Sequence, residues 1–149
     1  MKVVIQRSKE ANVIVDNKIV GSINKGLVIL VGFTQNDTSK EIDYIVDKII
    51  NLRIFDDENG IMNKSLLDTE GEILSISQFT LYADTRKGRR PSYINALNSE
   101  NAIKLYEEFN QKLSSNNIKV EQGIFGADMQ VSLTNDGPIT IIIEKNNDN

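Results

Sequence analysis

The sequence predicts a single α/β domain, in which a largely antiparallel, barrel-like β-sheet packs against two helices. Several segments alternate apolar and polar residues, which is typical of half-buried strands, whereas two others carry apolar residues at helical spacing. No internal repeat, low-complexity tract or linker divides the 149 residues, so we expect one domain over residues 1–149.

The first strands are expected to form an antiparallel meander. Apolar residues alternate in segments 3–5, 13–15 and 19–23, and the pair Asp16-Asn17 suits a hairpin turn between the last two. Residues 27–31 are continuously apolar, so they predict a strand that is covered on both faces.

Two amphipathic helices are predicted from residue spacing and from capping. Thr38 and Glu41 fit a capping box, and the apolar residues after them recur every three or four positions until Ile50. Ser99 is expected to be the N-cap of a second helix, which ends in the polar run 114–117. Its apolar face would consist of residues 102, 106, 109 and 113.

The remaining strands bring polar side chains to strand ends. Residues 72–79 predict a buried strand that ends in Ser77 and Gln78, so Thr80 is expected close to its C-terminal end. Further strands are expected at residues 118–120, 129–133 and 139–143, the last two as a hairpin that turns at residues 135–137.

Composition restricts the chemistry of the protein. The chain has no histidine and no cysteine, which excludes an imidazole base, a Ser-His-Asp triad, a thiolate nucleophile and a thiolate zinc site. The acidic segment 56–60 lacks the spaced ligands and the closing glutamate of an EF-hand, and we expect neither a metal nor a cofactor. Catalysis must therefore use hydroxyls, carboxylates, lysines, backbone dipoles or groups of the substrate.

Charge and hydropathy favour a protein of the cytoplasm. The longest apolar run, 27–31, is too short to cross a bilayer, and the N-terminal segment becomes polar too soon for a signal peptide. The net charge is −4, yet four cations occur within five residues, Arg86, Lys87, Arg89 and Arg90. This basic run is either a solvated loop or a patch that contacts phosphates.

Two motifs resemble those of a known family. They are Ser77-Gln78-Phe79-Thr80-Leu81 and Asn135-Asp136-Gly137-Pro138-Ile139-Thr140. Together with segments 4–7, 51–55, 82–91 and 125–129, they resemble the D-aminoacyl-tRNA deacylases (D-tyrosyl-tRNA deacylase family) in order along nearly the whole chain.

The resemblance implies a homodimeric tRNA-editing hydrolase without a cofactor. Such enzymes hydrolyse the ester that joins a D-amino acid, or glycine mischarged on tRNA-Ala, to the 3′-terminal adenosine. The expected partner is aminoacylated tRNA, with no DNA and no membrane. The 2′-hydroxyl beside the ester can assist hydrolysis, which explains how a protein without histidine performs it.

The resemblance implies that the catalytic residues are Ser77, Gln78, Phe79 and Thr80. Backbone N–H groups of Phe79 and Thr80 would stabilise the developing oxyanion. Thr80 has three alternative roles, as a nucleophile, as a group that positions the ester, or as a plain strand residue. Positioning is favoured because no histidine exists to take the hydroxyl proton.

The resemblance also implies that the second motif reads chirality. Gly137 and Pro138, joined by a cis peptide bond, would enter the partner's pocket and exclude an L side chain with main-chain atoms. Arg7 would anchor this dipeptide, and Thr140 and Met129 would complete the substrate-binding residues. Without the resemblance, Gly137 and Pro138 indicate an ordinary hairpin turn with a trans bond, and Arg7 a surface arginine.

Two other functions remain compatible with the sequence. A non-catalytic module could bind the 3′ end of tRNA by stacking on Phe79 and through the basic run. Alternatively, the chain could be an interface or regulatory domain that binds no RNA. Hydrolysis of D-tyrosyl-tRNA, with L-tyrosyl-tRNA spared, distinguishes an editing enzyme from both.

Overall fold

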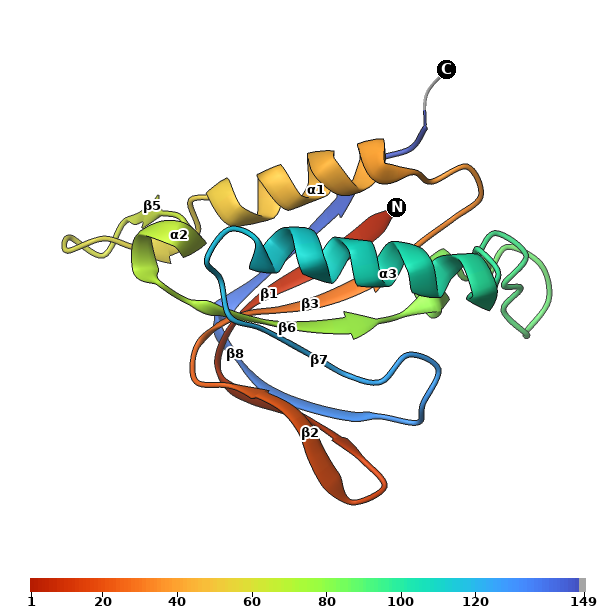
Figure 1. Cartoon of the computed structure of the whole chain (residues 1–149), viewed down its shortest axis with the longest axis horizontal. Coiled ribbons are helices and arrows are strands. Elements are labelled where there is room, and N and C mark those ends of the chain that lie inside the picture. The colour runs from red at the N-terminus through yellow and green to blue at the C-terminus, as the bar shows by residue number, and fades with distance from the viewer. Residues whose placement is uncertain (148–149) are drawn as a thin grey trace.

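Figure 1 shows the computed structural model, which describes residues 1–147. A six-stranded sheet forms its centre, with the strand order β2-β1-β3-β6-β7 and with β8 paired to β1 as well. The strands are β1 (Lys2–Val15), β2 (Lys18–Ile23), β3 (Gly26–Gly32), β6 (Glu72–Ser77), β7 (Val120–Gln122) and β8 (Gln130–Glu144). The predicted α/β class and the curved, barrel-like sheet are confirmed.

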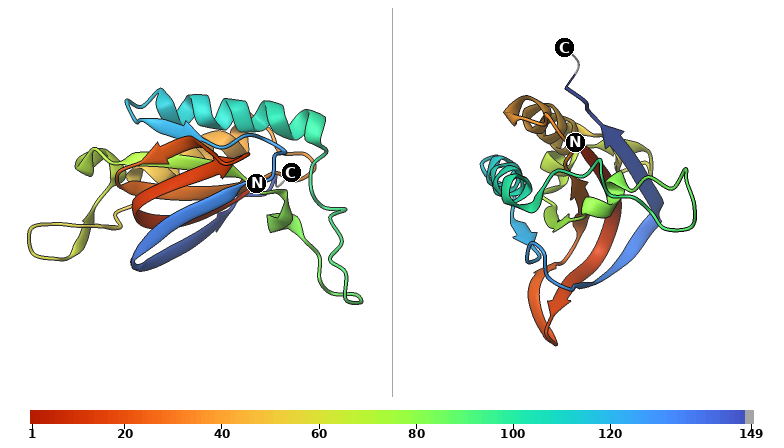
Figure 2. Two further views of the ribbon diagram at one scale, coloured as in Figure 1. Left: turned by 90° about the horizontal axis from the view of Figure 1, so that it is seen from below. Right: turned by 90° about the vertical axis from the view of Figure 1, so that its right-hand side faces the viewer.

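The N-terminal meander forms as the sequence predicts. Asp16 and Asn17 both have positive φ values, 49° and 63°, as a type I′ hairpin turn requires, and they join β1 to β2. Residues 2–8 of β1 pair with β3, whereas residues 11–15 pair with β2. The sheet therefore curls where β1 passes from one neighbour to the next, as Figure 2 shows.

Two strand pairs are parallel, although the sequence predicts a largely antiparallel sheet. β6 runs parallel to both β3 and β7. Helix α1 (Ser39–Asn51) lies in the connection from β3 to β6, and α3 (Ser99–Ser114) lies in the connection from β6 to β7. Parallel neighbours need such long crossovers, and both helices cover the same face of the sheet (Figure 1).

The helix ends follow capping chemistry. Thr38 caps α1, and both hydrogen bonds of the predicted capping box are present. The N-cap of α3 is Asn98 and not Ser99, because the Asn98 side chain accepts the hydrogen bond from the Asn101 N–H at 3.0 Å.

Three short elements carry no clear periodicity and are not predicted: α2 (Leu66–Thr69), β4 (Phe55–Asp56) and β5 (Met62–Lys64). Among residues 1–147, the helices are all too short or too polar to cross a membrane.

Apolar side chains pack on both faces of the curved sheet. The larger cluster lies between the sheet and the two long helices, and it includes the fully buried Ile5, Ile29 and Phe109. Successive strand residues point to opposite faces, so Val28 and Leu74 belong to a second cluster on the other face. The prediction that residues 27–31 form a strand covered on both faces is therefore confirmed.

The predicted C-terminal hairpin is wrong. Residues 130–144 form one strand, β8, which pairs antiparallel with β1 along nearly its whole length. Ser8 pairs with Asn135, and the next paired residues are Gln6 and Thr140. Residues 136–139 therefore have no partner in β1 and loop out of the sheet as a bulge. The long β1 offers a partner to both halves of β8, which leaves the turn-forming residues to make this bulge.

Candidate active site

The strongest candidate site lies where β6 ends. Ser77 is the last residue of β6, and a short 3₁₀ turn, η1 (Phe79–Tyr82), follows it. The N–H of Gln78 donates to the Val31 carbonyl oxygen of β3 at 2.7 Å, which fixes the strand end. Gly32 permits this close approach, because a Cβ there would lie 2.8 Å from the Gln78 carbonyl oxygen.

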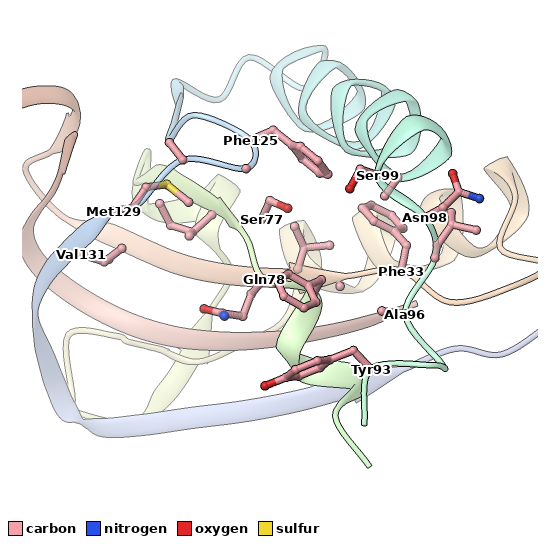
Figure 3. Close-up of a pocket in the computed structure, with 18 residues that line it drawn as sticks. Phe33, Ser77, Gln78, Tyr93, Ala96, Asn98, Ser99, Phe125, Met129 and Val131 are labelled. Atoms are coloured by element: carbon pink, nitrogen blue, oxygen red, sulfur yellow. The ribbon is translucent and has the colours of Figure 1, made fainter. Parts of the chain in front are cut away.

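A cavity of about 570 Å³ opens beside this turn, as Figure 3 shows. Ser77, Gln78 and Phe79 of the first motif line it together with Met129. The other walls come from the end of β3, the segment before α3, the start of α3, the loop before β8 and the start of β8, with Phe33, Tyr93, Ala96, Asn98, Ser99, Phe125 and Val131. Its size and its mixture of apolar and polar groups suit a small ligand.

Thr80 lies outside the cavity wall. Its Oγ1 accepts a hydrogen bond from Nε2 of Gln78. An amide cannot take a proton from a hydroxyl, so this contact gives Thr80 no general base. Within residues 1–147, the N–H groups of Phe79 and Thr80 donate no hydrogen bond, as is usual at the start of a helical turn.

An aromatic pair marks the mouth of the cavity. The rings of Phe79 and Tyr93 meet edge to face with their centroids 5.1 Å apart. Both rings are partly open to solvent, with 55% of Phe79 and 42% of Tyr93 exposed. The side chains of Thr34 and Gln35 donate hydrogen bonds to the backbone carbonyls of residues 94–96 and so fix the segment that carries Tyr93.

A buried tyrosine connects the walls of the cavity. The Tyr106 hydroxyl of α3 donates to the Ser75 carbonyl oxygen of β6 at 2.8 Å, and the Gly123 N–H donates to the same oxygen at 3.2 Å. Burial raises the pKa of Tyr106, so its hydroxyl keeps the proton that it donates. One carbonyl of β6 thus joins α3 to the loop that carries Phe125 and Met129.

The second motif lies apart from this cavity. Gly137 and Pro138 are exposed, they are not part of the cavity wall, and the peptide bond between them is cis. The Asn135 side chain accepts a hydrogen bond from the Ile139 N–H at 2.7 Å and donates one to Oγ1 of Thr140 at 2.8 Å. Asn135 and Thr140 therefore close the neck of the bulge.

Arg7 holds the bulge from behind. Its Nε donates to the Asp136 carbonyl oxygen at 2.9 Å, and its Nη1 donates to the Ile54 carbonyl oxygen at 2.8 Å. Its Nη2 lies 3.5 Å from the place that a Cβ of Gly137 would take. The Arg7 side chain is largely buried, so it is a fixed support for the bulge and not a mobile surface group.

The basic run lies on the exposed loop between η1 and α3. Asp84 and Ser92 exchange backbone hydrogen bonds at 2.7 and 2.9 Å, which close the base of this loop next to Tyr93. The Arg86 guanidinium binds the Asp84 carboxylate through two hydrogen bonds at 2.9 and 2.8 Å, and this lowers the pKa of Asp84 to about 2. The other three cations of the run form no ion pair within residues 1–147.

The acidic segment 56–60 uses its carboxylate locally. Oδ1 of Asp57 accepts hydrogen bonds from the N–H groups of Asn59 and Ile61 at 2.8 and 3.0 Å. These bonds lower the pKa of Asp57. Nowhere in the part of the chain that the structure describes do three acidic side chains gather closely enough to hold a metal ion.

Several lining residues carry no signal in the sequence. Phe33 follows a predicted strand, and Tyr93 lies in a loop without periodicity, so neither is singled out. Phe125 belongs to a segment that resembles the deacylases, which is the one available signal for the loop before β8. Ser99 is predicted only as a helix cap, yet it lines the cavity.

The fold and the cavity define the class of the protein, an α/β domain with a mixed, nearly closed sheet and a ligand-sized cavity at the end of β6. A family model described as D-Tyr-tRNA(Tyr) deacylase matches residues 4–144. The chain therefore belongs to this family of hydrolases, as the two motifs predict.

Relatives agree with this assignment, and solved structures share the fold. A D-aminoacyl-tRNA deacylase of Bacillus cytotoxicus is 58% identical over 144 residues, which are 97% of this chain and 99% of the relative. One of Clostridium tetani is 59% identical over 144 residues, 97% of each chain. A structure named c-Myc DNA Unwinding Element Binding Protein has a TM-score of 0.92 at 40% identity, over 99% of this chain and 100% of its own. A probable eukaryotic D-amino acid tRNA deacylase shares the fold, with a TM-score of 0.82 at 18% identity over 95% of this chain and 97% of its own.

Proposed function

We propose that the chain edits tRNA by cleaving the ester of D-aminoacyl-tRNA to free tRNA and amino acid. One observation carries this proposal: the first motif lines a ligand-sized cavity in a chain that D-aminoacyl-tRNA deacylases match over 97% of its length. Glycine mischarged on tRNA-Ala would also be a substrate, because glycine has no side chain to exclude. The reaction would take place in the cytoplasm, where charged tRNA is used.

The proposed reaction relies on the substrate and on the backbone. The 2′-hydroxyl beside the ester can donate and accept hydrogen bonds, so it replaces the absent histidine in activating water. The N–H groups of Phe79 and Thr80 stabilise the charge on the ester oxygen, each by about 3 kcal/mol. Thr80 positions this turn through its hydrogen bond with Gln78 and is not the nucleophile, so Thr80→Ser should remain active.

Chiral discrimination in this proposal requires a second copy of the chain. Gly137 and Pro138 do not line the cavity of their own chain, so they can restrict it only from a partner. In a two-fold homodimer each bulge enters the other protomer's cavity, which gives two identical sites. Main-chain atoms that Arg7 holds in place exclude an L side chain there, because they cannot swing aside.

The exposed cations supply affinity for RNA in this proposal. Lys87, Arg89 and Arg90 lie on a loop whose base adjoins the wall of the cavity, and they are free to contact phosphates of the substrate. Arg86 contributes less, because Asp84 already neutralises its charge.

Release of amino acid from tRNA charged with D-tyrosine or L-tyrosine tests the proposed function. We expect hydrolysis of the D form, protection of the L form, and little dependence on which D side chain is present. Equal rates on both forms would reject chiral selection. Binding of tRNA without any release would instead support the non-catalytic module.

A further inference from the structure

An exposed apolar patch borders the cavity on the side of the basic loop. It consists of the Phe79 and Tyr93 rings, which meet edge to face, together with Ile94, which follows Tyr93 in the chain and has 77% of its surface exposed. Phe79 and Tyr93 line the cavity as well, whereas Ile94 lies outside it. Grouped apolar side chains at the surface, unlike scattered single ones, mark binding sites.

The backbone of this patch is fixed even though its side chains face solvent. Thr34 and Gln35 hold the carbonyls of residues 94–96, and the Leu97 N–H donates to the Phe33 carbonyl oxygen at 3.0 Å. On the other side, the paired backbone hydrogen bonds between Asp84 and Ser92 restrain the preceding loop. A surface that is ordered before binding loses little conformational entropy when a ligand arrives.

We propose that this patch binds the unpaired nucleobase that precedes the terminal adenosine of the RNA substrate, by stacking on the Tyr93 ring. The inference rests on the proposed function, because the terminal aminoacyl-adenosine must occupy the cavity for the preceding nucleotide to lie at its mouth. The patch is continuous with the cavity wall through Phe79 and Tyr93, so it offers the RNA strand a path out of the cavity.

Charge favours RNA over a protein as the occupant. The loop that leads into the patch carries Lys87, Arg89 and Arg90, which form no ion pair within residues 1–147 and are exposed. Cations beside aromatic rings match a single strand, whose phosphates and bases they contact in turn. Because every base has a π face, the patch would detect the presence of a base and not its identity.

The test compares KM values for D-tyrosyl acceptor-stem RNA with an intact or an abasic nucleotide before the terminal adenosine. Tyr93→Leu keeps apolar bulk without a ring, and Tyr93→Phe is the matched control that keeps the ring. Loss of stacking should raise KM about 5- to 150-fold, either in Tyr93→Leu on intact RNA or in the wild type on abasic RNA. Tyr93→Phe should resemble the wild type, and Tyr93→Leu should lose nothing further on abasic RNA.

Other outcomes would overturn this inference in distinguishable ways. Absence of wild-type hydrolysis on intact D-tyrosyl RNA would reject the proposed function itself. An active wild type with equal KM values on both RNAs would reject stacking alone, and this comparison does not depend on the folding of any variant. If Ile94→Ser dissociates a dimer in sedimentation and leaves KM unchanged, the patch is a protein interface and the inference is wrong.

Discussion

The two motifs lie at interruptions of two strands, and the chain leaves the sheet differently at each. After β6 it turns into η1, and neighbouring elements enclose a cavity beside that turn. In β8 it loops outward, and Gly137 and Pro138 stay exposed. A close backbone approach at Gly32 fixes the first region, whereas a buried arginine, Arg7, fixes the second. We therefore propose that the first region receives a ligand and that the second acts as a rigid projection.

Gly32→Ala should lower the deacylation rate more than any other substitution considered, because it displaces the cavity wall and leaves the bulge in β8 unchanged. Its Cβ would lie 2.8 Å from the Gln78 carbonyl oxygen and 3.3 Å from the Cβ of Leu81, so η1 must shift. A displacement of about 1 Å near reacting groups can lower the rate about 100-fold, and the overpacking should cost about 1–3 kcal/mol of unfolding free energy. Deacylation kinetics and urea unfolding measure the two effects.

Gly60→Ala is the matched control for this change. Gly60 has no atom within 4 Å of its Cβ position but a φ of +75°, so the substitution should cost about 1 kcal/mol and leave kcat unchanged. Equal losses of kcat in both variants would show that general destabilisation, and not the position of η1, explains the result.

Arg7→Ala should affect the projection more than the cavity. It removes the donors to the Asp136 and Ile54 carbonyls, each at a cost of about 1–3 kcal/mol, and it frees the bulge to yield. The ratio of D- to L-tyrosyl-tRNA hydrolysis should therefore fall more than the D rate does. Arg7→Lys keeps the charge but not the planar guanidinium group, so its ratio of D- to L-tyrosyl-tRNA hydrolysis should lie between those of the wild type and Arg7→Ala. A lower melting temperature with an unchanged ratio would contradict the supporting role.

Charge removal from the basic run should lower RNA affinity without changing selectivity. Neutral replacements of Lys87, Arg89 and Arg90 together should reduce the salt slope of tRNA binding by about 2 to 3, since each phosphate contact contributes about 0.7 to 0.9. Arg86→Gln is the control and should change the slope little, because Asp84 already pairs with Arg86. If Arg86→Gln instead lowers the salt slope by about 0.7 to 0.9, as the loss of one free cation would, the pair of Arg86 with Asp84 opens when RNA binds.

Tyr106→Phe should have the smallest effect. It removes one hydrogen bond to the Ser75 carbonyl oxygen, worth about 1 kcal/mol, and should raise KM by up to about 5-fold with kcat unchanged. Ser75→Ala is the control, because its buried Oγ has no hydrogen-bond partner in the described chain. If both variants change KM equally, packing at this position and not the hydroxyl connects the cavity walls.

Local features of the fold could be predicted from the sequence, whereas long-range pairing could not. The turn at Asp16-Asn17 and the capping box at Thr38 depend on a few neighbouring residues, and both are confirmed. The hairpin at residues 135–137 is wrong because the same residues suit a bulge, and only the length of β1 decides between them. The parallel pairs of β6 likewise depend on the paths of two distant helices.

The candidate site shows the same division. The first motif identifies Ser77 and Gln78, but Phe33 and Tyr93 reach the cavity only because separate elements converge there. The pair of Arg86 with Asp84 depends on the path of a loop, so a count of charges cannot predict it. The exposure of Gly137 and Pro138 outside the cavity of their own chain agrees with what the resemblance implies, whereas the residues alone indicate only a hairpin turn.

A heterodimer that carries one lesion in each protomer tests the shared site most directly. Gly32→Ala damages the cavity, and Gly137→Val damages the bulge, where a Cβ would lie 2.9 Å from Cγ1 of Ile139 at a φ of +139°. The Gly32→Ala homodimer should be nearly inactive, and the Gly137→Val homodimer should hydrolyse D- and L-tyrosyl-tRNA alike. The heterodimer, isolated with two different C-terminal tags, keeps one undamaged site and should regain D selectivity at about half the wild-type rate. A heterodimer that remains unselective, or wild-type selectivity in a proven monomer, would contradict the composite site.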